Sequence, residues 1–523
     1  MTTPFEQLAV LVQEQEPNMP AIFDLCVEFF DSDEEEYIAT WIPYLEENAP
    51  FMKEDVFPIA MEFLCMSATR LFPFAKFAVE MTDLVAVPEL EQVQSIDFWG
   101  VQDLKGFKEF INSPYLANLK DLSFLEIPLT TKVLSTLATS EIAPNLTTLS
   151  FVGGVGDKEL GALLEGNTLT GLKSFLLYNT KVSDKGLRIV SEASCLSNLE
   201  ELVVSTDEVS RDVSYKGIKA LKKASFVENL TFLDMSGYTM GDRAIKTLAK
   251  VEASNLKQLQ LLSIRLGDEG FEALMNSPLS YELQALSVGQ NELTGKSFAS
   301  LAQSSGLAHL EMLDMQSNQL AGGVDALENA KFISGLTEFG LGNNSLDAES
   351  AKTLAGLGFE KLKGLSLTLN SIGSEGAAAI FGASWFAGLE SLELASCELD
   401  DASLKALVEQ ESELALTELT LADNQITDEG AKLLAGVKSF EKLHKFDLSN
   451  NQVTKAGVDV LCSSEHLGHL TQETIDLDDP VVQQLVAQFQ GMLGEEFDPA
   501  DMMGPANADG FVDHLVLSVQ ADI

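Results

Sequence analysis

Apolar and polar residues form a pattern that repeats along most of the chain, and the pattern is clearest at residues 416–443. There the order L-x-x-L-x-L-x-x-N-x-I runs from Leu416 to Ile426, and a turn at residues 427–430 leads into an apolar helical run at 431–435. The same order begins again at Leu443. This pattern predicts a strand–turn–helix unit, which cannot bury its apolar face alone and must stack on copies of itself.

The units recur at a spacing of 26 or 27 residues, apart from one interval of 31 residues between Leu199 and Leu230. The fourteen units begin at Val93, Leu119, Leu146, Leu172, Leu199, Leu230, Leu256, Leu283, Leu310, Leu336, Leu362, Leu389, Leu416 and Leu443. We predict that their strands form a parallel sheet with the leucines pointing inward, and that the helical legs cover the other side. Because helices are wider than strands, the array should bend into a horseshoe with the sheet on its concave face.

Three residue types recur at set places in the unit. An asparagine at the turn should bond backbone groups that the turn leaves unpaired, and it occurs as Asn291, Asn318, Asn344, Asn370, Asn424 and Asn451. A glycine early in the helical leg predicts a close helix–strand approach, and it occurs as Gly186, Gly217, Gly270, Gly376, Gly430 and Gly457. A phenylalanine before the next strand should stack as a spine, and it occurs as Phe226, Phe332, Phe359, Phe386 and Phe440. Polar pairs such as Ser183-Asp184, Gly267-Asp268 and Thr427-Asp428 should begin the helices.

Both ends of the chain lack the repeat. Residues 1–88 are rich in proline and aromatic residues, and we predict an all-helical N-terminal cap or docking domain. The repeats occupy 89–479. Residues 480–523 follow as an acidic C-terminal cap or tail, with a closing helix over 481–493.

The formal charge of −47 argues against binding to nucleic acid or to an anionic membrane surface. It is compatible with a basic protein partner, and equally with a surface adapted for solubility or salt. No secretory signal or membrane span is visible, so we expect a cytoplasmic protein, while delivery out of the cell as an effector stays open. The five cysteines lie far apart, as is typical of reduced thiols.

A search for catalytic chemistry leads to no enzyme. The chain has no phosphate-binding loop, nucleophile elbow or H-E-x-x-H pair. Cys462, His466 and His469 lie close together without a fourth ligand, and a calcium-like stretch at 507–510 lacks its first and last ligands, so we expect no metal and no cofactor.

The outward strand positions form columns across the predicted sheet. One column contains Asp234, Asp314, Glu393 and Asp447, and its neighbour contains Phe232, Met312, Glu338 and Glu418. Acids with a few aromatic or methionine anchors are typical of a face that binds a basic or mixed protein partner. The candidate partner-binding residues are Tyr178, Phe232, Asp234, Met312, Asp314, Glu338, Glu393, Glu418 and Asp447. Leu262 and Leu369 should add exposed apolar area, and the extra loop at 205–212 should project beside this face.

The order L-x-x-L-x-L-x-x-N-x-[LIV]-[TS]-D-[EK]-G resembles the ribonuclease-inhibitor class of leucine-rich repeats over roughly residues 90–470. The resemblance implies a curved β/α solenoid and protein recognition on the concave face and rims. The function expected is that of a non-enzymatic interaction scaffold. Two alternatives stay open: a regulatory activator of a nucleotide-binding partner, and an adaptor for ubiquitin transfer in which residues 1–88 recruit the machinery. The sequence leaves the oligomeric state open.

Overall fold

The computed structural model describes residues 93–99, 104–207, 210–409 and 413–467, with isolated positions at 70–71, 81, 85, 90–91 and 475–476. The chain divides into two compact units, Met1–Tyr238 and Thr239–Ile523, and each is described by itself. Nearly all of the expected cap at 1–88, and all of the expected tail at 480–523, lie outside the described residues. Those two domain assignments therefore stay predictions.

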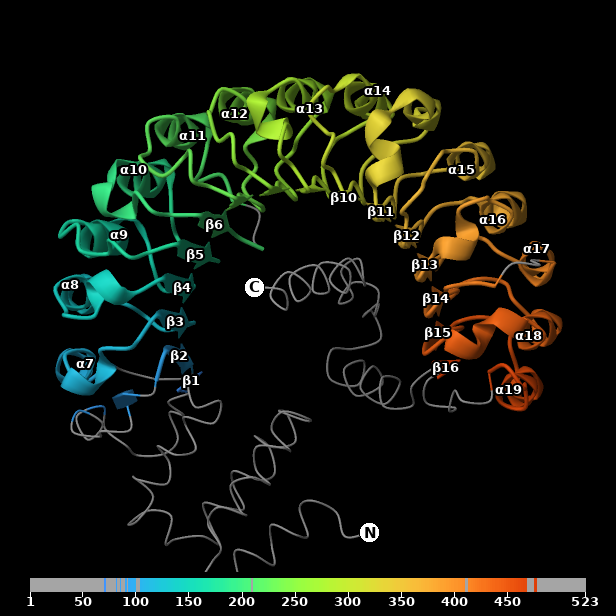
Figure 1. Ribbon diagram of the computed structural model, residues 1–523, viewed down its shortest axis with the longest axis horizontal. Helices are drawn as coiled ribbons and strands as arrows, with labels where there is room; N and C mark the ends of the chain where they lie inside the picture. Colours follow the sequence, from blue (N-terminus) through green and yellow to red (C-terminus); the bar gives the residue numbers. More distant parts are fainter. Residues whose placement is uncertain are drawn as a thin grey trace, which may run out of the picture. The chain divides into compact units, whose positions relative to one another are not determined.

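Unit 1 is a parallel sheet whose strands pair in chain order, with helices layered over one of its faces (Figure 1). Its strands are β1 (Arg70–Leu71), β2 (Ser95–Trp99), β3 (Asp121–Leu125), β4 (Thr148–Val152), β5 (Ser174–Tyr178), β6 (Glu201–Ser205) and β7 (Phe232–Asp234). Its helices are α7 (Phe107–Ile111), α8 (Thr131–Ala138), α9 (Asp157–Leu164), α10 (Asp184–Glu192) and α11 (Tyr215–Leu221). Short 3-10 turns η4 (Pro114–Leu116), η5 (Ala143–Asn145) and η6 (Ser194–Leu196) lead back to the sheet.

Unit 2 continues the same design. Its strands are β8 (Gln258–Gln260), β9 (Ala285–Ser287), β10 (Met312–Asp314), β11 (Glu338–Gly340), β12 (Gly364–Ser366), β13 (Ser391–Glu393), β14 (Glu418–Thr420), β15 (Lys445–Asp447) and β16 (Ile475–Asp476). Its α-helices are α12 (Gly241–Leu248), α13 (Asp268–Met275), α14 (Lys296–Gln303), α15 (Ala348–Ala355), α16 (Gly373–Phe381), α17 (Leu404–Val408), α18 (Asp428–Ala435) and α19 (Lys455–Cys462). Its 3-10 turns are η7 (Pro278–Ser280), η8 (Val324–Asn329), η9 (Lys331–Gly335), η10 (Phe386–Gly388) and η11 (Lys438–Lys442).

The predicted parallel strands, and the predicted alternation of strand and helix, are confirmed. The core lies between the sheet and the helical layer, where the pattern leucines Leu416, Leu419 and Leu421 are at most 1% exposed. The leg after β10 departs from the prediction because it forms η8 and η9 instead of an α-helix. This leg begins at Gly322, whose backbone is in the left-handed region, and the residue that caps η8 is Gly323. Glycine has no hydroxyl or carboxylate to accept a hydrogen bond from the first turn, so an α-helix is not capped there.

The turn asparagines satisfy backbone groups, as predicted. Asn344 is fully buried, and its amide nitrogen donates to the carbonyl oxygens of Met315, Leu341 and Gly342, each at 3.0 Å. The backbone N–H of Asn344 in turn donates to the side-chain oxygen of Asn370 in the next repeat. Each asparagine therefore joins consecutive repeats. Cys397 holds the same place in another repeat, and its thiol donates to the carbonyl oxygen of Leu367 at 3.1 Å.

Aspartates at the helix starts form a second ladder between repeats. The two carboxylate oxygens of Asp184 accept hydrogen bonds from the backbone N–H and the hydroxyl of Ser214, at 2.7 and 2.8 Å. Because the acceptor belongs to one helix and the donors cap the next, the carboxylate fixes the spacing of neighbouring helices. The same bridge joins Asp157 to Ser183, Asp268 to Thr294, Asp401 to Thr427, and Asp428 to Thr454.

This ladder explains the recurring glycine, and it corrects the prediction of a close helix–strand approach. A Cβ at Gly217 would lie 2.8 Å from Asp184 Oδ1, and one at Gly270 would lie 2.7 Å from Asp242 Oδ1. The close approach is therefore between adjacent helices. At five of the six positions the glycine leaves room for a carboxylate of the preceding repeat, whereas at Gly376 the neighbours in that repeat are Ala348 and Ala351.

The predicted phenylalanine spine is buried, but its ring contacts run to other aromatic residues. Phe359 packs edge-on against Trp385 at 5.3 Å, and Phe440 contacts Phe446 at 6.2 Å. A stack that the sequence reasoning missed lies in unit 1, on the inward side of its strands. There Phe124 is stacked between Phe98 and Phe151, at 5.2 and 5.5 Å.

Candidate protein-binding face

The columns of outward residues predicted for the sheet face are confirmed by the strand register. In unit 2, Met312, Glu338 and Gly364 are partners on successive strands, and Asp314 pairs with Gly340 in the neighbouring column. The column that contains Met312 and Glu338 continues through Ser391 and Glu418 to Lys445. The column that contains Asp314 continues through Ser366, Glu393 and Thr420 to Asp447. In unit 1, Phe232 pairs with Glu201 and Asp234 with Val203.

The nine candidate residues differ in exposure. Tyr178 is 36% exposed, and Phe232, Met312, Glu338, Glu393, Glu418 and Asp447 are half-buried. Asp234 and Asp314 were expected to be accessible like the others, but they are only 6% and 0% exposed. Their carboxylates bend back onto the backbone N–H two residues later, that of Ser236 at 2.8 Å and that of Gln316 at 3.0 Å. The two aspartates therefore offer little surface for direct contact.

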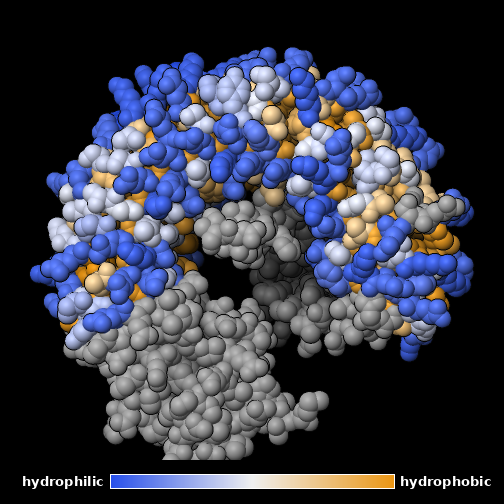
Figure 2. All heavy atoms as spheres, in the orientation of Figure 1, coloured by the Kyte–Doolittle hydropathy of each residue, from blue (hydrophilic) through white to orange (hydrophobic). Residues whose placement is uncertain are grey.

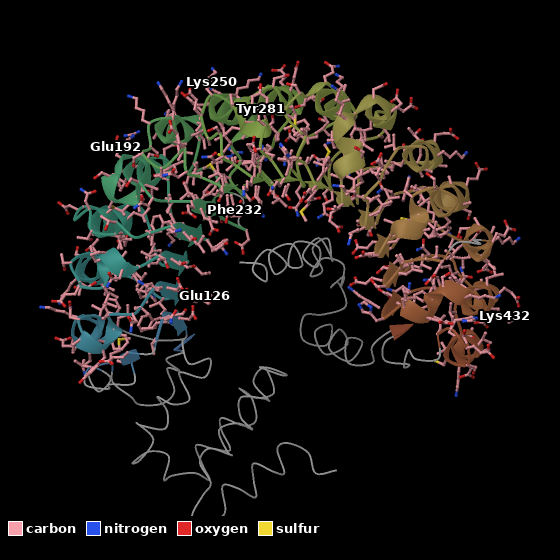
Figure 3. The ribbon with its side chains drawn as sticks, in the orientation of Figure 1. Glu126, Glu192, Phe232, Lys250, Tyr281 and Lys432 are labelled. Atoms are coloured by element: carbon pink, nitrogen blue, oxygen red, sulfur yellow. The ribbon has the colours of Figure 1, made fainter. Side chains whose placement is uncertain are left out.

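The face of unit 1 combines an exposed aromatic ring with buried negative charge. Burial raises the pKa of Tyr178 to about 12, and the negative charges of Asp234 and Glu201 add to the shift. Burial also raises the pKa of Asp234, although its hydrogen bonds with Ser236 oppose that effect. Phe232 lies on the same face, on the sheet side of the unit (Figure 3).

Glu338 is a half-buried carboxylate with a perturbed pKa on the face of unit 2. Its carboxylate lies across Gly364 on the next strand, where it occupies the space that a side chain at that position would fill. Burial raises the pKa of Glu338 to about 7, and the charges of Glu390, Glu393 and Glu418 contribute, while Lys363 opposes them. A neighbouring positive charge would reverse this shift, because it would favour the ionised carboxylate.

The cations on this face are already engaged with other acids. Lys363 forms an ion pair with Glu390 at 2.8 Å, and Lys445 lies 3.8 Å from Glu418. Lys363 and Glu390 were missed by the sequence reasoning. They stand in the column immediately before the strands, so a search extended by one position toward the N-terminus would have found them.

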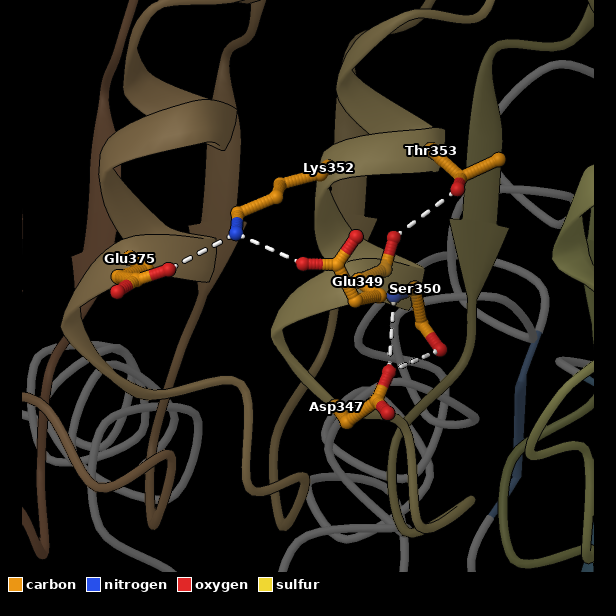
Figure 4. A network of polar contacts seen from close by, with 6 residues as sticks. All are labelled: Asp347, Glu349, Ser350, Lys352, Thr353 and Glu375. Carbon is orange, nitrogen blue, oxygen red and sulfur yellow. Dashed lines mark hydrogen bonds and ion pairs between the residues drawn. The ribbon is translucent and has the colours of Figure 1, made fainter.

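The helical face, in contrast, carries acids that are paired with lysines between repeats. Lys352 donates to Glu349 of its own helix and to Glu375 of α16, both at 2.8 Å (Figure 4). Hydrophilic side chains predominate over the helices in the space-filling view (Figure 2). Such exposed pairs contribute little to stability.

No chemistry beyond binding emerges from the part of the chain that the structure describes. Within it, no group of three or more His, Cys, Asp or Glu side chains could hold a metal ion. Of the three residues weighed as a zinc site and rejected, His466 lies 3.3 Å from a carboxylate oxygen of Glu441, and His469 lies outside the described residues. The described cysteines Cys195, Cys397 and Cys462 are free thiols. None of the described helices has the length and apolarity needed to cross a membrane.

The extra loop at 205–212 is described except for residues 208–209. Asp207 donates its backbone N–H to the side-chain oxygen of Asn179 at 2.8 Å, and the hydroxyl of Ser210 donates to Asp212 at 2.9 Å. The role of this loop in recognition stays a prediction. Of the expected exposed apolar residues, Leu369 is 43% exposed, whereas Leu262 is half-buried.

With this geometry established, comparison with known families identifies the repeat. Four segments match the leucine-rich-repeat family model, residues 360–381, 389–408, 416–435 and 441–462, and each corresponds to one strand–turn–helix unit. The chain therefore contains leucine-rich repeats. No curated protein sequence matches it.

Several solved structures are similar in fold. An internalin of Listeria monocytogenes shares 18% identity with a TM-score of 0.40, covering 76% of this chain and 94% of that one. A leucine-rich-repeat protein of Leptospira interrogans shares 19% identity with a TM-score of 0.40, covering 75% and 91%. The yeast structure of Rad7 in complex with Elc1 shares 15% identity with a TM-score of 0.44, covering 85% and 98%.

Proposed function

We propose that this chain is a non-enzymatic scaffold that binds a protein partner on the sheet face of its repeats. The observation that carries the proposal is a group of half-buried glutamates, Glu338, Glu393 and Glu418, on the sheet face of unit 2. The carboxylate of Glu338 has no hydrogen bond or ion pair with any described residue. Unbalanced charge on a rigid face favours a partner of opposite sign.

The binding mechanism follows from the exposures of these side chains. Glu338, Glu393 and Glu418 are half-buried, so they lose little conformational freedom when a partner covers them. Met312 is half-buried beside Glu338 and supplies apolar contact area. The acids attract a basic or mixed surface over a distance, and the apolar side chains hold it once it is in place.

Two further features belong to the proposal. The unit length of 26 or 27 residues and the α-helical legs support assignment of the repeats to the ribonuclease-inhibitor class. The free, buried thiols of Cys195 and Cys397 support a reducing compartment such as the cytoplasm.

The experiment compares three purified full-length proteins as bait in a lysate of the source cell. The first is the unaltered chain, and the second carries Glu338→Gln, Glu393→Gln and Glu418→Gln. The third is a control with the same loss of charge among exposed acids outside the sheet, Glu252→Gln, Glu272→Gln and Glu328→Gln. Captured proteins are identified by mass spectrometry, and the dissociation constant of each is then measured with purified components.

A partner that binds the chain and the control, but not the sheet-face variant, supports the proposal. A partner that binds all three equally would place recognition away from the sheet face and would refute this mechanism.

A further inference from the structure

Two neighbouring strands of unit 2 carry glycine at outward positions, Gly340 on β11 and Gly364 on β12. We call these two residues the glycine patch. Asp314 is the strand partner of Gly340, and Glu338 is the strand partner of Gly364. The two strands therefore carry no side chains of their own at these positions, and both glycines are buried beside the two carboxylates.

The glycines are required by the way these carboxylates lie. A Cβ at Gly364 would overlap the carboxylate of Glu338, and a Cβ at Gly340 would lie 2.9 Å from Asp314 Oδ1. Both acids therefore lie flat along the sheet face instead of extending into solvent. Glu393 completes the arrangement, two strands beyond Gly340 in the same column.

Polar groups at this place lack partners among the described residues. Asp314 Oδ2 and Gln316 Nε2 have no hydrogen-bond partner, although their residues are only 0% and 8% exposed. A buried carboxylate oxygen without a donor carries an energetic penalty that a nearby positive charge relieves. Lys363, whose charge acts on Glu338, is itself paired with Glu390 at 2.8 Å. Among the described residues, neither Glu338 nor Asp314 forms an ion pair with a lysine or arginine.

We propose that the glycine patch, with Glu338, Glu393 and the buried Asp314 around it, binds an arginine side chain of a basic segment in the partner protein. This inference rests on the proposed function and names the chemistry of the partner. A guanidinium is planar and always charged, and its rigid fork of N–H donors can bond two carboxylates at once. Glu338 and Glu393 make the contacts, and Asp314 contributes its negative charge from beneath.

Other cationic ligands fit less well. A calcium or magnesium ion requires several oxygen ligands converging on one point, and the described residues include no such group. A lysine ammonium would be attracted to the same acids, but it is a compact, strongly hydrated charge without the rigid fork of donors that bonds two carboxylates at once.

The affinity for arginine should also depend on pH, and this dependence tests the contact with Glu338 independently. The charged groups that face Glu338 are Glu390, Glu393, Glu418 and Lys363, and burial raises its pKa to about 7. Arginine binding favours the ionised form, so binding expels the proton that Glu338 holds below that pH. Affinity should therefore rise from pH 6 to pH 8.

The test uses a fluorescein-labelled peptide with two arginines in a glycine–serine background, titrated with the full-length chain at low salt and followed by fluorescence anisotropy. Glu338→Gln should weaken binding about tenfold, because it removes one charge-assisted hydrogen bond. Glu328→Gln, which removes an exposed charge on the helical side, should leave the affinity unchanged. A peptide with citrulline in place of arginine should not bind. The pH dependence should disappear in Glu338→Gln.

The outcomes separate this inference from general attraction to an acidic protein. Equal weakening by Glu338→Gln and Glu328→Gln, or equal binding of citrulline and arginine peptides, overturns it. A partner captured through the sheet face that binds independently of Glu338, together with no binding of the arginine peptide, overturns the inference and leaves the proposed function standing. Binding of the arginine peptide that depends on Glu338 supports the inference even when the lysate provides no partner.

Discussion

Replacing Asn344 by alanine tests whether the asparagine ladder holds the repeats of unit 2 together. Its amide nitrogen donates to three carbonyl oxygens, and its side-chain oxygen accepts from the backbone N–H of Asn318 at 3.1 Å. Most of these partners keep another hydrogen bond. Leu341 still accepts from Asn370, and Met315 still accepts from the side chain of Asn318.

The expected loss follows from what remains unpaired. The N–H of Asn318 loses its acceptor within the protein interior, at a cost of ~1–3 kcal/mol. The two N–H groups of the Asn344 side-chain amide are also lost, and the hydrogen bonds that each one donates have a net contribution of ~1 kcal/mol. We therefore expect Asn344→Ala to lower the free energy of unfolding by about 3–5 kcal/mol.

The assay is urea unfolding followed by circular dichroism at 222 nm. The matched control is Asn276→Ala, because Asn276 is exposed and its one side-chain hydrogen bond, to the carbonyl oxygen of Glu272, lies at the surface. The control should change stability by less than about 1 kcal/mol. A loss for Asn344→Ala no larger than that of the control would refute the assignment of the ladder as a structural element.

Three further results are expected. Gly270→Ala should destabilise the protein by about 1–3 kcal/mol, because the new Cβ would lie 2.9 Å from the Asp242 backbone; Gly161→Ala, in a helix position with open space, should instead gain up to ~1 kcal/mol in the same urea titration. Leu419→Ala should cost about 2–5 kcal/mol through a core cavity, and unchanged unfolding would show that the residue does not face the core. The pKa of Glu338 in the folded protein lies near 7, above its value in the unfolded chain. Its contribution to stability is therefore complete in acid and is lost as the pH rises through 7. Between pH 5 and pH 8, the thermal unfolding temperature of Glu338→Gln should decline less than that of the unaltered chain.

The candidate site illustrates where reasoning from a single sequence succeeds and where it fails. The columns that contain Met312, Glu338 and Glu418 follow from counting residues, because strand register repeats with the unit. The burial of Asp314 does not follow from counting. It depends on a side-chain rotamer that folds the carboxylate onto the Gln316 N–H, and on the neighbouring glycine that permits this.

The sequence by itself determined the repeat, its strands, its buried leucines and the place of the turn asparagine, since each depends on periodic spacing within one unit. Only the tertiary structure decided which atoms meet between units. It showed that the turn asparagines join neighbouring repeats, that the glycine of α11 faces Asp184 of the preceding helix, and that the carboxylate of Glu338 lies across Gly364. These contacts join residues about one repeat apart, and their geometry depends on how closely neighbouring units stack. Periodicity within a unit does not contain that distance.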